Sequence, residues 1–216
     1  MDNLNKYIEH TLLKQDAQRS DLIKIFDEAK ENKFLGVCIN PCYVKLAKDN
    51  LKDPDVKVIT VIGFPLGANT SEVKVFETKN AIQNGADEID MVINVTKLKD
   101  DEKDFIVNEI SSIKKACDGH NLKVIIETDL LTKDEIIRAC KYSVEGGADF
   151  VKTSTGFVKG GVGAKAEDVK LMYETVKNAG LKVKASGGIR DKEAAIAMIK
   201  AGAERLGTSS GVKIVS

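Results

Sequence analysis

The sequence has few of the residues on which metal and disulfide chemistry depend. It contains two histidines, His10 and His120, which lie far apart along its 216 residues. Zinc sites usually take several imidazole or thiolate ligands, so two distant histidines argue against a bound transition metal. The four cysteines include no Cys-x-x-Cys pair, and in a chain of this size we expect free thiols rather than a disulfide scaffold. We therefore expect no metal and no cofactor.

The chain also lacks a net charge and a long apolar run. Its 33 basic and 33 acidic residues give a formal net charge of zero. This balance is unlike the basic footprint of a nucleic-acid-binding protein, although a local anion site is compatible with it. No run approaches the roughly 18 apolar residues of a membrane span, and Met1–Lys6 has no apolar signal region. We predict a cytoplasmic protein without nucleic-acid or membrane partners.

The composition suits one folded unit. Hydrophobic residues make up 43% of the chain and charged residues 31%, which is enough apolar material for a sizeable core. No linker, low-complexity tract or shift in composition divides the sequence. We predict a single domain over residues 1–216.

Short runs rich in β-branched residues alternate with longer helical patterns along the whole chain. Each interval between two runs is long enough for a helix. The pattern predicts eight strands: His10–Leu13, Gly36–Ile39, Lys57–Ile62, Glu88–Ile93, Lys123–Glu127, Asp149–Lys152, Lys182–Ala185 and Arg205–Gly207.

The expected helices carry signals at both ends. Ser20 is placed to cap the first one, and Thr132 with Glu135 forms a capping-box pattern ahead of another. A repeated Gly-Ala-acid motif precedes several strands. Its glycine suits a left-handed helix end, and its alanine suits close packing of the returning chain. The motif occurs in Asn84–Asp87, Gly146–Asp149 and Ala201–Glu204.

Repeated strand–helix units predict an α/β fold, a single (β/α)8 TIM barrel. An open doubly wound sheet is the alternative, and it would favour a glycine-rich dinucleotide loop after the first strand. His10–Lys14 contains no glycine, which favours the barrel. In a barrel, chemistry is expected at the C-terminal ends of the strands.

Ionisable residues lie near the ends of three expected strands. Asp90, Lys152 and Lys184 are each set among apolar neighbours. A single such lysine would be explained by a packed aliphatic stem whose ammonium group reaches solvent. Two lysines on neighbouring strands, with an aspartate nearby, instead favour a catalytic site.

An amine nucleophile must be neutral, and a second lysine nearby can help to keep the first one neutral. A free lysine has a pKa of about 10.4, so only a few molecules in ten thousand are neutral at pH 7. Burial and a neighbouring cation both disfavour the ammonium form. Lys184 is the natural second cation for Lys152. Asp90 can exchange protons with intermediates and keep Lys184 charged.

Two glycine-rich segments follow the last two expected strands. Gly187 and Gly188 follow the seventh strand, and Ser209 and Ser210 follow the eighth. Barrels often bind phosphate in these loops, where small residues let backbone amides approach the oxygens. We predict a phosphate site in these two loops. Arg190 either steers the phosphate or is simply solvated.

At this point the chain resembles the deoxyribose-phosphate aldolase family, whose members are class I, Schiff-base aldolases. The resemblance runs through almost the whole sequence, as several long motifs in the same order. The segments that carry it are Ile8–Leu13, Gly36–Pro41, Val61–Gly67, Asn84–Asn94, Phe150–Phe157 and Lys182–Arg190.

The resemblance implies the barrel fold and a reversible cleavage of 2-deoxyribose 5-phosphate into acetaldehyde and glyceraldehyde 3-phosphate. By analogy, Lys152 forms the imine, Lys184 perturbs it and relays protons, and Asp90 works with Lys184. The phosphate-binding residues that the resemblance implies are Gly187, Gly188, Ser209 and Ser210. The implied partner is a small sugar phosphate, and a homodimer or larger homo-oligomer is compatible with the sequence. The competing hypotheses are a Schiff-base enzyme with another aldehyde donor, a phosphosugar isomerase and a non-catalytic phosphosugar-binding barrel.

Some positions depart from the family pattern or have a structural explanation. Asp129 is acidic where a small or neutral residue is expected, and the segment Lys159–Ala166 is slightly long. Either feature could change the mouth of the site. We expect Cys38 to be a core thiol and His10 to serve packing.

Overall fold

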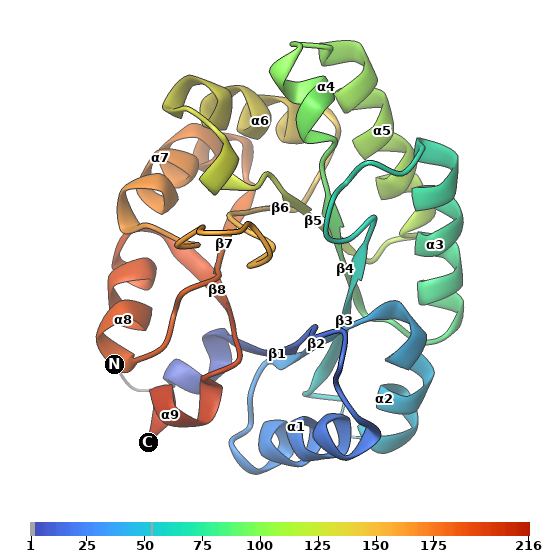
Figure 1. Ribbon diagram of the computed structural model, residues 1–216, viewed down its shortest axis with the longest axis vertical. Coiled ribbons are helices and arrows are strands. Elements are labelled where there is room, and N and C mark those ends of the chain that lie inside the picture. The colour runs from blue at the N-terminus through green and yellow to red at the C-terminus, as the bar shows by residue number, and fades with distance from the viewer. Residues whose placement is uncertain (1–2, 53) are drawn as a thin grey trace.

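The computed structural model describes residues 3–52 and 54–216, so Met1, Asp2 and Asp53 lie outside the described residues. Within these ranges, eight parallel strands close into a barrel in the order of the chain (Figure 1). The strands are β1 (Ile8–Leu12), β2 (Gly36–Ile39), β3 (Lys57–Ile62), β4 (Glu88–Val92), β5 (Asn121–Ile125), β6 (Phe150–Lys152), β7 (Lys182–Ser186) and β8 (Ala203–Thr208).

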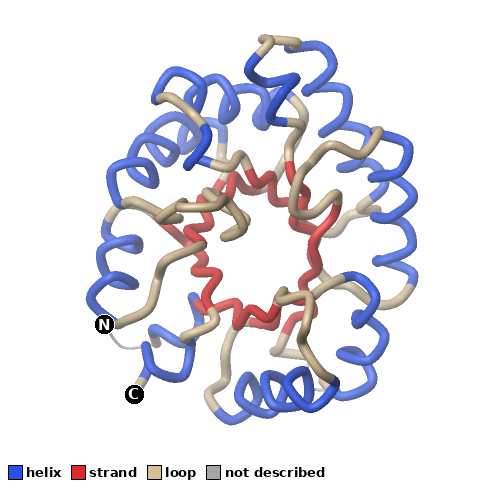
Figure 2. Tube along the Cα trace, viewed as in Figure 1, coloured by secondary structure: helices blue, strands red, loops and turns tan. Residues whose placement is uncertain are grey.

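Helices surround the ring of strands (Figure 2). They are α1 (Arg19–Glu31), α2 (Val44–Asn50), α3 (Ser71–Gln83), α4 (Val95–Lys99), α5 (Lys103–Ala116), α6 (Lys133–Glu145), α7 (Ala166–Val176), α8 (Lys192–Lys200) and α9 (Gly211–Val215).

The pairing of the first and last strands decides between the two predicted architectures. β1 pairs with β8 in parallel, with Ile8 opposite Leu206 and Glu9 opposite Gly207. This pairing closes the sheet, so the (β/α)8 barrel is confirmed and the open doubly wound alternative is wrong.

The alternation of side chains along each strand separates two environments. On β4, Ile89 and Met91 point outward into the apolar layer between sheet and helices. Glu88 and Asp90, on the other face of the same strand, point into the barrel and are fully buried. Burying each large apolar side chain contributes about 1.5–3 kcal/mol, so the outer layer supplies most of the stability. The interior is therefore free to hold polar groups.

Helix ends follow the predicted signals with one exception. Thr132 and Glu135 form the expected capping box at the start of α6. Ser20, however, is not the cap of α1. The helix begins at Arg19, so its N-cap is Gln18, two residues before the predicted cap, and the backbone N–H of Gln18 donates to Asp21 at 2.9 Å. Reciprocal bonds between these two side chains and the backbone satisfy the free helix amides, so the serine is not needed.

The repeated glycine motif behaves as predicted. Gly85, Gly147 and Gly202 have φ of 103°, 79° and 112° at the ends of α3, α6 and α8. The alanine after each glycine is buried. The motif thus turns each helix back toward the next strand of the barrel.

Two strands differ from their predicted bounds in a way that affects the site. β1 begins at Ile8 rather than His10, which brings Glu9 into the barrel wall. β5 ends at Ile125, so Glu127 lies beyond the strand, with a left-handed φ of 62°. Both glutamates are buried. The predicted bounds left Glu9 outside the first strand and made Glu127 the last residue of the fifth.

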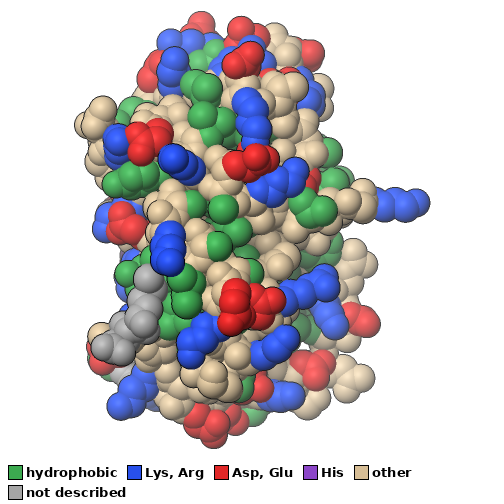
Figure 3. Space-filling view, turned by 90° about the vertical axis from the view of Figure 1, so that its left-hand side faces the viewer, with side chains coloured by type: hydrophobic (Ala, Val, Ile, Leu, Met, Phe, Trp, Pro, Cys, Tyr) green, Lys and Arg blue, Asp and Glu red, His purple; other side chains and the backbone are tan. Residues whose placement is uncertain are grey.

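The outer surface mixes charges of both signs. On the side that carries α7 and α8, basic and acidic side chains are interspersed with small apolar areas (Figure 3). Across residues 3–52 and 54–216, none of the helices combines the length and the apolar character needed to span a membrane.

Candidate active site

Charged side chains fill one half of the barrel interior. The other half, around β2 and β3, is apolar and contains Leu13, Cys38, Ile59 and Val61. The charged half draws on β1 and on β4 through β8. Its members are Glu9, Glu88, Asp90, Lys123, Lys152, Lys184 and Arg205.

The structure brings the three predicted catalytic residues together at one carboxylate oxygen. Lys152 ends β6 and lies directly opposite Lys184 on β7. Asp90 Oδ2 accepts hydrogen bonds from Lys152 Nζ at 2.9 Å and from Lys184 Nζ at 2.6 Å. The side chain of Lys152 is 4% exposed, while Asp90 and Lys184 have no exposed surface. The two lysines are therefore held next to each other by a shared anion.

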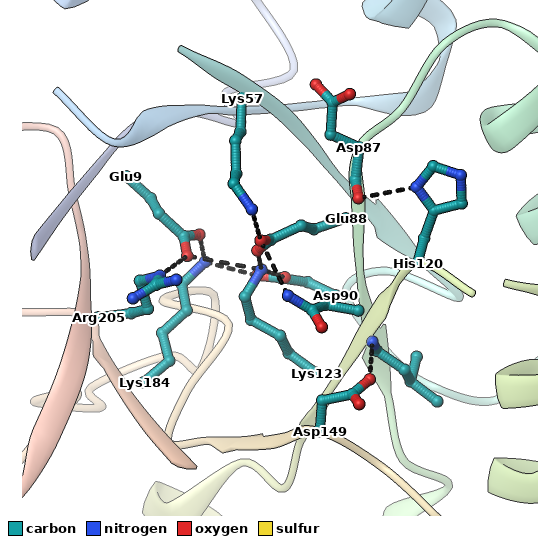
Figure 4. Close-up of polar contacts among 12 residues, drawn as sticks. Glu9, Lys57, Asp87, Glu88, Asp90, His120, Lys123, Asp149, Lys184 and Arg205 are labelled. Carbon is teal, nitrogen blue, oxygen red and sulfur yellow. Dashed lines mark hydrogen bonds and ion pairs between the residues drawn. The ribbon is translucent and has the colours of Figure 1, made fainter. Parts of the chain in front are cut away.

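Three further residues of this network were not predicted (Figure 4). Lys184 Nζ also donates to Glu9, across the closure of the barrel. Lys123 Nζ lies 3.0 Å from Asp90 Oδ1 and 2.6 Å from Glu88 Oε2. The sequence could have indicated Glu88, because side chains alternate along a strand and Glu88 therefore shares a face with Asp90. Glu9 was missed because the predicted first strand began two residues too late, and Lys123 was missed because it was placed at the start of its strand.

Burial and ion pairing oppose each other at these sites, and pairing prevails. Burial lowers the pKa of Lys184, but Asp90 and Glu9 raise it above its ordinary value overall. Burial raises the pKa of Asp90, but the three surrounding lysines hold it well below its ordinary value. The pKa of Glu88 is lowered to about 2 by Lys123 and Lys57, against the effect of burial. These groups are all charged near neutral pH.

The interior charges balance when Lys152 is neutral. Glu9, Glu88 and Asp90 supply the negative charges, and Lys123, Lys184 and Arg205 supply the positive ones. The side chain of Lys57 contacts Glu88 at 2.7 Å but is 38% exposed, so its charge is largely solvated. A neutral amine on Lys152 is the form that a nucleophile requires, and it leaves no buried charge unmatched.

A cavity of about 330 Å³ opens above Lys152 at the C-terminal ends of the strands. The four residues predicted to bind phosphate all line it, and so does Arg190. Gly187 and Gly188 have φ of 83° and 73°, a conformation that favours glycine and turns the backbone toward the cavity. Small residues and backbone amides beside a buried lysine can hold an anionic group at a fixed distance from the amine.

Glu127 and Thr155 form a second buried contact at the cavity wall. Glu127 accepts hydrogen bonds from the backbone N–H of Thr155 at 3.0 Å and from its hydroxyl. Burial raises the pKa of Glu127. Thr155 lines the cavity, so this carboxyl group fixes part of its wall. No sequence signal placed Glu127 here, because the contact depends on the left-handed turn after β5.

Cys38 and His10 have the structural surroundings that were expected. Cys38 is fully buried in the apolar half of the interior, and burial raises the pKa of its thiol. His10 points away from the interior. Its Nε2 lies 2.7 Å from Glu28 on α1, and its ring packs against Phe34 with 5.2 Å between ring centroids.

Comparisons with known proteins agree with this geometry. A model of the DeoC/LacD family aldolases matches residues 4–216. A deoxyribose-phosphate aldolase from Finegoldia magna is 56% identical over 212 residues, 98% of each chain. The solved structure of an aldolase called QR15 has a TM-score of 0.94 at 43% identity, covering 99% of this chain and 95% of its own.

A more distant relative has the same fold. The deoxyribose phosphate aldolase from Aeropyrum pernix, described as a unique tetramer, has a TM-score of 0.91 at 34% identity and covers 98% of this chain and 89% of its own. With its barrel, its buried lysine pair and these full-length matches, the chain belongs to the DeoC/LacD family of aldolases.

Proposed function

We propose that this protein is a deoxyribose-phosphate aldolase, which reversibly cleaves 2-deoxy-D-ribose 5-phosphate to acetaldehyde and D-glyceraldehyde 3-phosphate. The observation that carries the proposal is the placement of Lys152. It lies at the base of the cavity and shares Asp90 with a second lysine. The full-length identity to aldolases of this name favours this reaction over the isomerase and the non-catalytic barrel considered above.

The first half of the reaction forms a bond to the lysine. Neutral Lys152 attacks the C1 aldehyde of the open-chain sugar, and loss of water gives a protonated imine, which acts as an electron sink. A base removes the proton of the C3 hydroxyl. The C2–C3 bond then breaks, its electron pair moves toward the imine, and glyceraldehyde 3-phosphate leaves.

The second half returns the enzyme to its starting state. An enamine remains on Lys152, and protonation at C2 converts it back to an imine. Hydrolysis of the imine releases acetaldehyde and restores the amine. Asp90, which contacts both lysines, and Lys184 are our candidates for the proton relay, together with water.

The phosphate group would occupy the other end of the cavity. We assign it to the turn of Gly187 and Gly188 and to Ser209 and Ser210 at the start of α9. Arg190 also lines the cavity and can attract the phosphate from the rim.

Reduction with borohydride in the presence of substrate tests the covalent step. We expect the Lys152 peptide to gain the mass of the reduced adduct, and Lys152→Arg to give neither adduct nor product. Lys141→Ala, which changes an exposed lysine on α6, is the matched control and should behave as the unmodified protein. An adduct absent from Lys152 would contradict the imine mechanism. Product analysis with other phosphosugars distinguishes this substrate from another aldehyde donor.

Three further properties stay predictions. We expect the chain to act in the cytoplasm, to form one domain over residues 1–216 and to self-associate. The tetramer described for the Aeropyrum pernix protein supports self-association without fixing its size here. Light scattering of the purified protein measures the assembly directly.

A further inference from the structure

Asp129 is the acidic residue that departs from the family pattern, and the structure shows what it contacts. It lies in a short 3-10 turn, Thr128–Leu130, just beyond β5. Its Oδ2 accepts a hydrogen bond from the backbone N–H of Gly163 at 2.8 Å, and its Oδ1 accepts one from Val162 at 3.3 Å. Gly161 fits closely over the same carboxylate, since a Cβ there would lie 2.7 Å from Oδ2. Asp129 thus holds the loop that connects β6 to α7 by hydrogen bonds to its backbone.

The backbone of this β6–α7 loop packs directly against the backbone of the Gly187–Gly188 turn, which is predicted to bind phosphate. The N–H of Ala164 donates to the carbonyl oxygen of Gly187 at 3.0 Å. A Cβ on Gly163 would lie 2.4 Å from the carbonyl carbon of Gly187, and one on Gly188 would lie 2.3 Å from the carbonyl oxygen of Val162. No side chain separates the two segments. A shift of the loop must therefore displace the turn or open a gap behind it.

The tube view shows the same arrangement at larger scale. The loop between β6 and α7 lies over the opening of the barrel on the side of β7 (Figure 2). Gly163 is buried within it, although Val162 beside it is 59% exposed. The slightly long segment noted in the sequence therefore packs behind the Gly187–Gly188 turn, which lines the cavity, rather than lying free on the surface.

We propose that Asp129 is a positioning residue that holds the Gly187–Gly188 turn in its phosphate-binding geometry through the β6–α7 loop. The proposal rests on the proposed function for the identity of the anion. The negative charge of Asp129 makes the positioning role testable, because positioning and electrostatics predict opposite effects on substrate binding. A carboxylate near a phosphate site repels the substrate, so a purely electrostatic role predicts tighter substrate binding when Asp129 is removed. A positioning role predicts weaker binding.

The experiment compares phosphorylated and unphosphorylated 2-deoxyribose with the intact chain and the variant Asp129→Ala. We expect the KM for the phosphorylated sugar to rise about tenfold, equivalent to about 1.4 kcal/mol of binding. We expect kcat/KM for the unphosphorylated sugar to stay within about twofold, because the imine chemistry does not use the turn. An unchanged or lowered KM for the phosphorylated sugar, or an equal loss with both sugars, overturns the proposal.

Two further variants isolate the cause. Asp134→Ala removes an exposed carboxylate from the first turn of α6, near the same mouth of the barrel, and should not raise the KM. A rise equal to that of Asp129→Ala would show that the effect does not depend on the contact between Asp129 and the loop, and would overturn the proposal. Asp129→Asn keeps one acceptor oxygen and should give an intermediate KM, and it also serves if the alanine variant does not fold.

Hydrogen exchange separates the positioning role from the proposed function. In Asp129→Ala we expect faster exchange at the amides of residues 162–164 and 187–188, with unchanged exchange in the barrel strands. Unchanged exchange at both segments would overturn the proposal even if kinetics changed. If the unmodified protein cleaves neither sugar, the proposed function fails, while hydrogen exchange still decides whether Asp129 holds the turn.

Discussion

At the scale of single residues, the main feature of the site is that three lysines share one carboxylate group. One oxygen of Asp90 serves both Lys152 and Lys184, and the other serves Lys123. Removing one cation therefore changes the partners of all the others. The role of Lys184 can be tested through this sharing.

We expect Lys184→Leu to reduce kcat by about 10²–10⁴-fold, the usual contribution of acid–base catalysis. Without Lys184, Asp90 has one cation fewer and pairs more strongly with a protonated Lys152. The ascending limb of the pH–rate profile should therefore move to higher pH, whereas Lys184→Arg, which keeps the charge, should move it less. Steady-state kinetics across a pH series measures both effects. An unchanged profile in the leucine variant would refute the assigned role.

Catalytic residues could be predicted from the sequence where a charged residue occurs at a position that is usually apolar. Lysines that end buried strands are rare, and this made Lys152 and Lys184 visible. Glu9 was invisible because the pattern around it supports a strand that starts slightly later. Glu127 and Asp129 could not be placed, because their contacts depend on a backbone turn and on a loop more than 25 residues away in the chain.

At the scale of elements, the helix ends are the most strongly specified features. The Gly-Ala-acid motif could be interpreted without the structure because left-handed helix ends favour glycine, which has no Cβ. Predicted strand ends differ from the observed ones by up to two residues. A strand stops where its hydrogen bonds to the neighbouring strand stop, and that information lies elsewhere in the chain.

Gly202 and Gly180 form a matched pair for testing this specification. Both have positive φ, 112° and 81°, but a Cβ on Gly202 would lie 2.5 Å from the ring of Tyr173, while a Cβ on Gly180 would meet no atom within 4 Å. We expect Gly180→Ala to lower the free energy of unfolding by about 1–2 kcal/mol, the cost of the backbone conformation. Gly202→Ala should cost about 1–3 kcal/mol more because of the clash. If urea unfolding shows the same loss of unfolding free energy in both variants, the predicted clash with Tyr173 is wrong.

At the scale of the whole molecule, an apolar outer layer stabilises a charged interior. Glu88 has a pKa of about 2 against its ordinary 4.5, because Lys123 and Lys57 outweigh burial. The pKa of Asp90 is lowered as well. The folded protein therefore binds these protons less tightly than the unfolded chain, so acid favours unfolding. The stabilisation that Glu88 contributes is present above about pH 4.5 and is lost as the pH falls toward 2.

Glu88→Gln tests this coupling. The variant should be less stable than the unmodified protein at neutral pH, because Lys123 loses a partner. Between about pH 5 and 2, it should lose about 3 kcal/mol less unfolding free energy than the unmodified protein, since the titrating group is absent. Urea unfolding at a series of pH values measures both slopes. Parallel curves would mean that Glu88 does not contribute to acid sensitivity.

The balance of three buried carboxylates against three cations also determines how charge changes during a turnover. A protonated imine on Lys152 would leave the interior with one excess positive charge, which a medium of low dielectric constant penalises. Cleavage of the C2–C3 bond cancels this charge, because the enamine nitrogen is neutral. The fixed charges of the barrel thus make the iminium species before and after the enamine the costly ones, and the enamine the electrically relaxed state of the covalent enzyme.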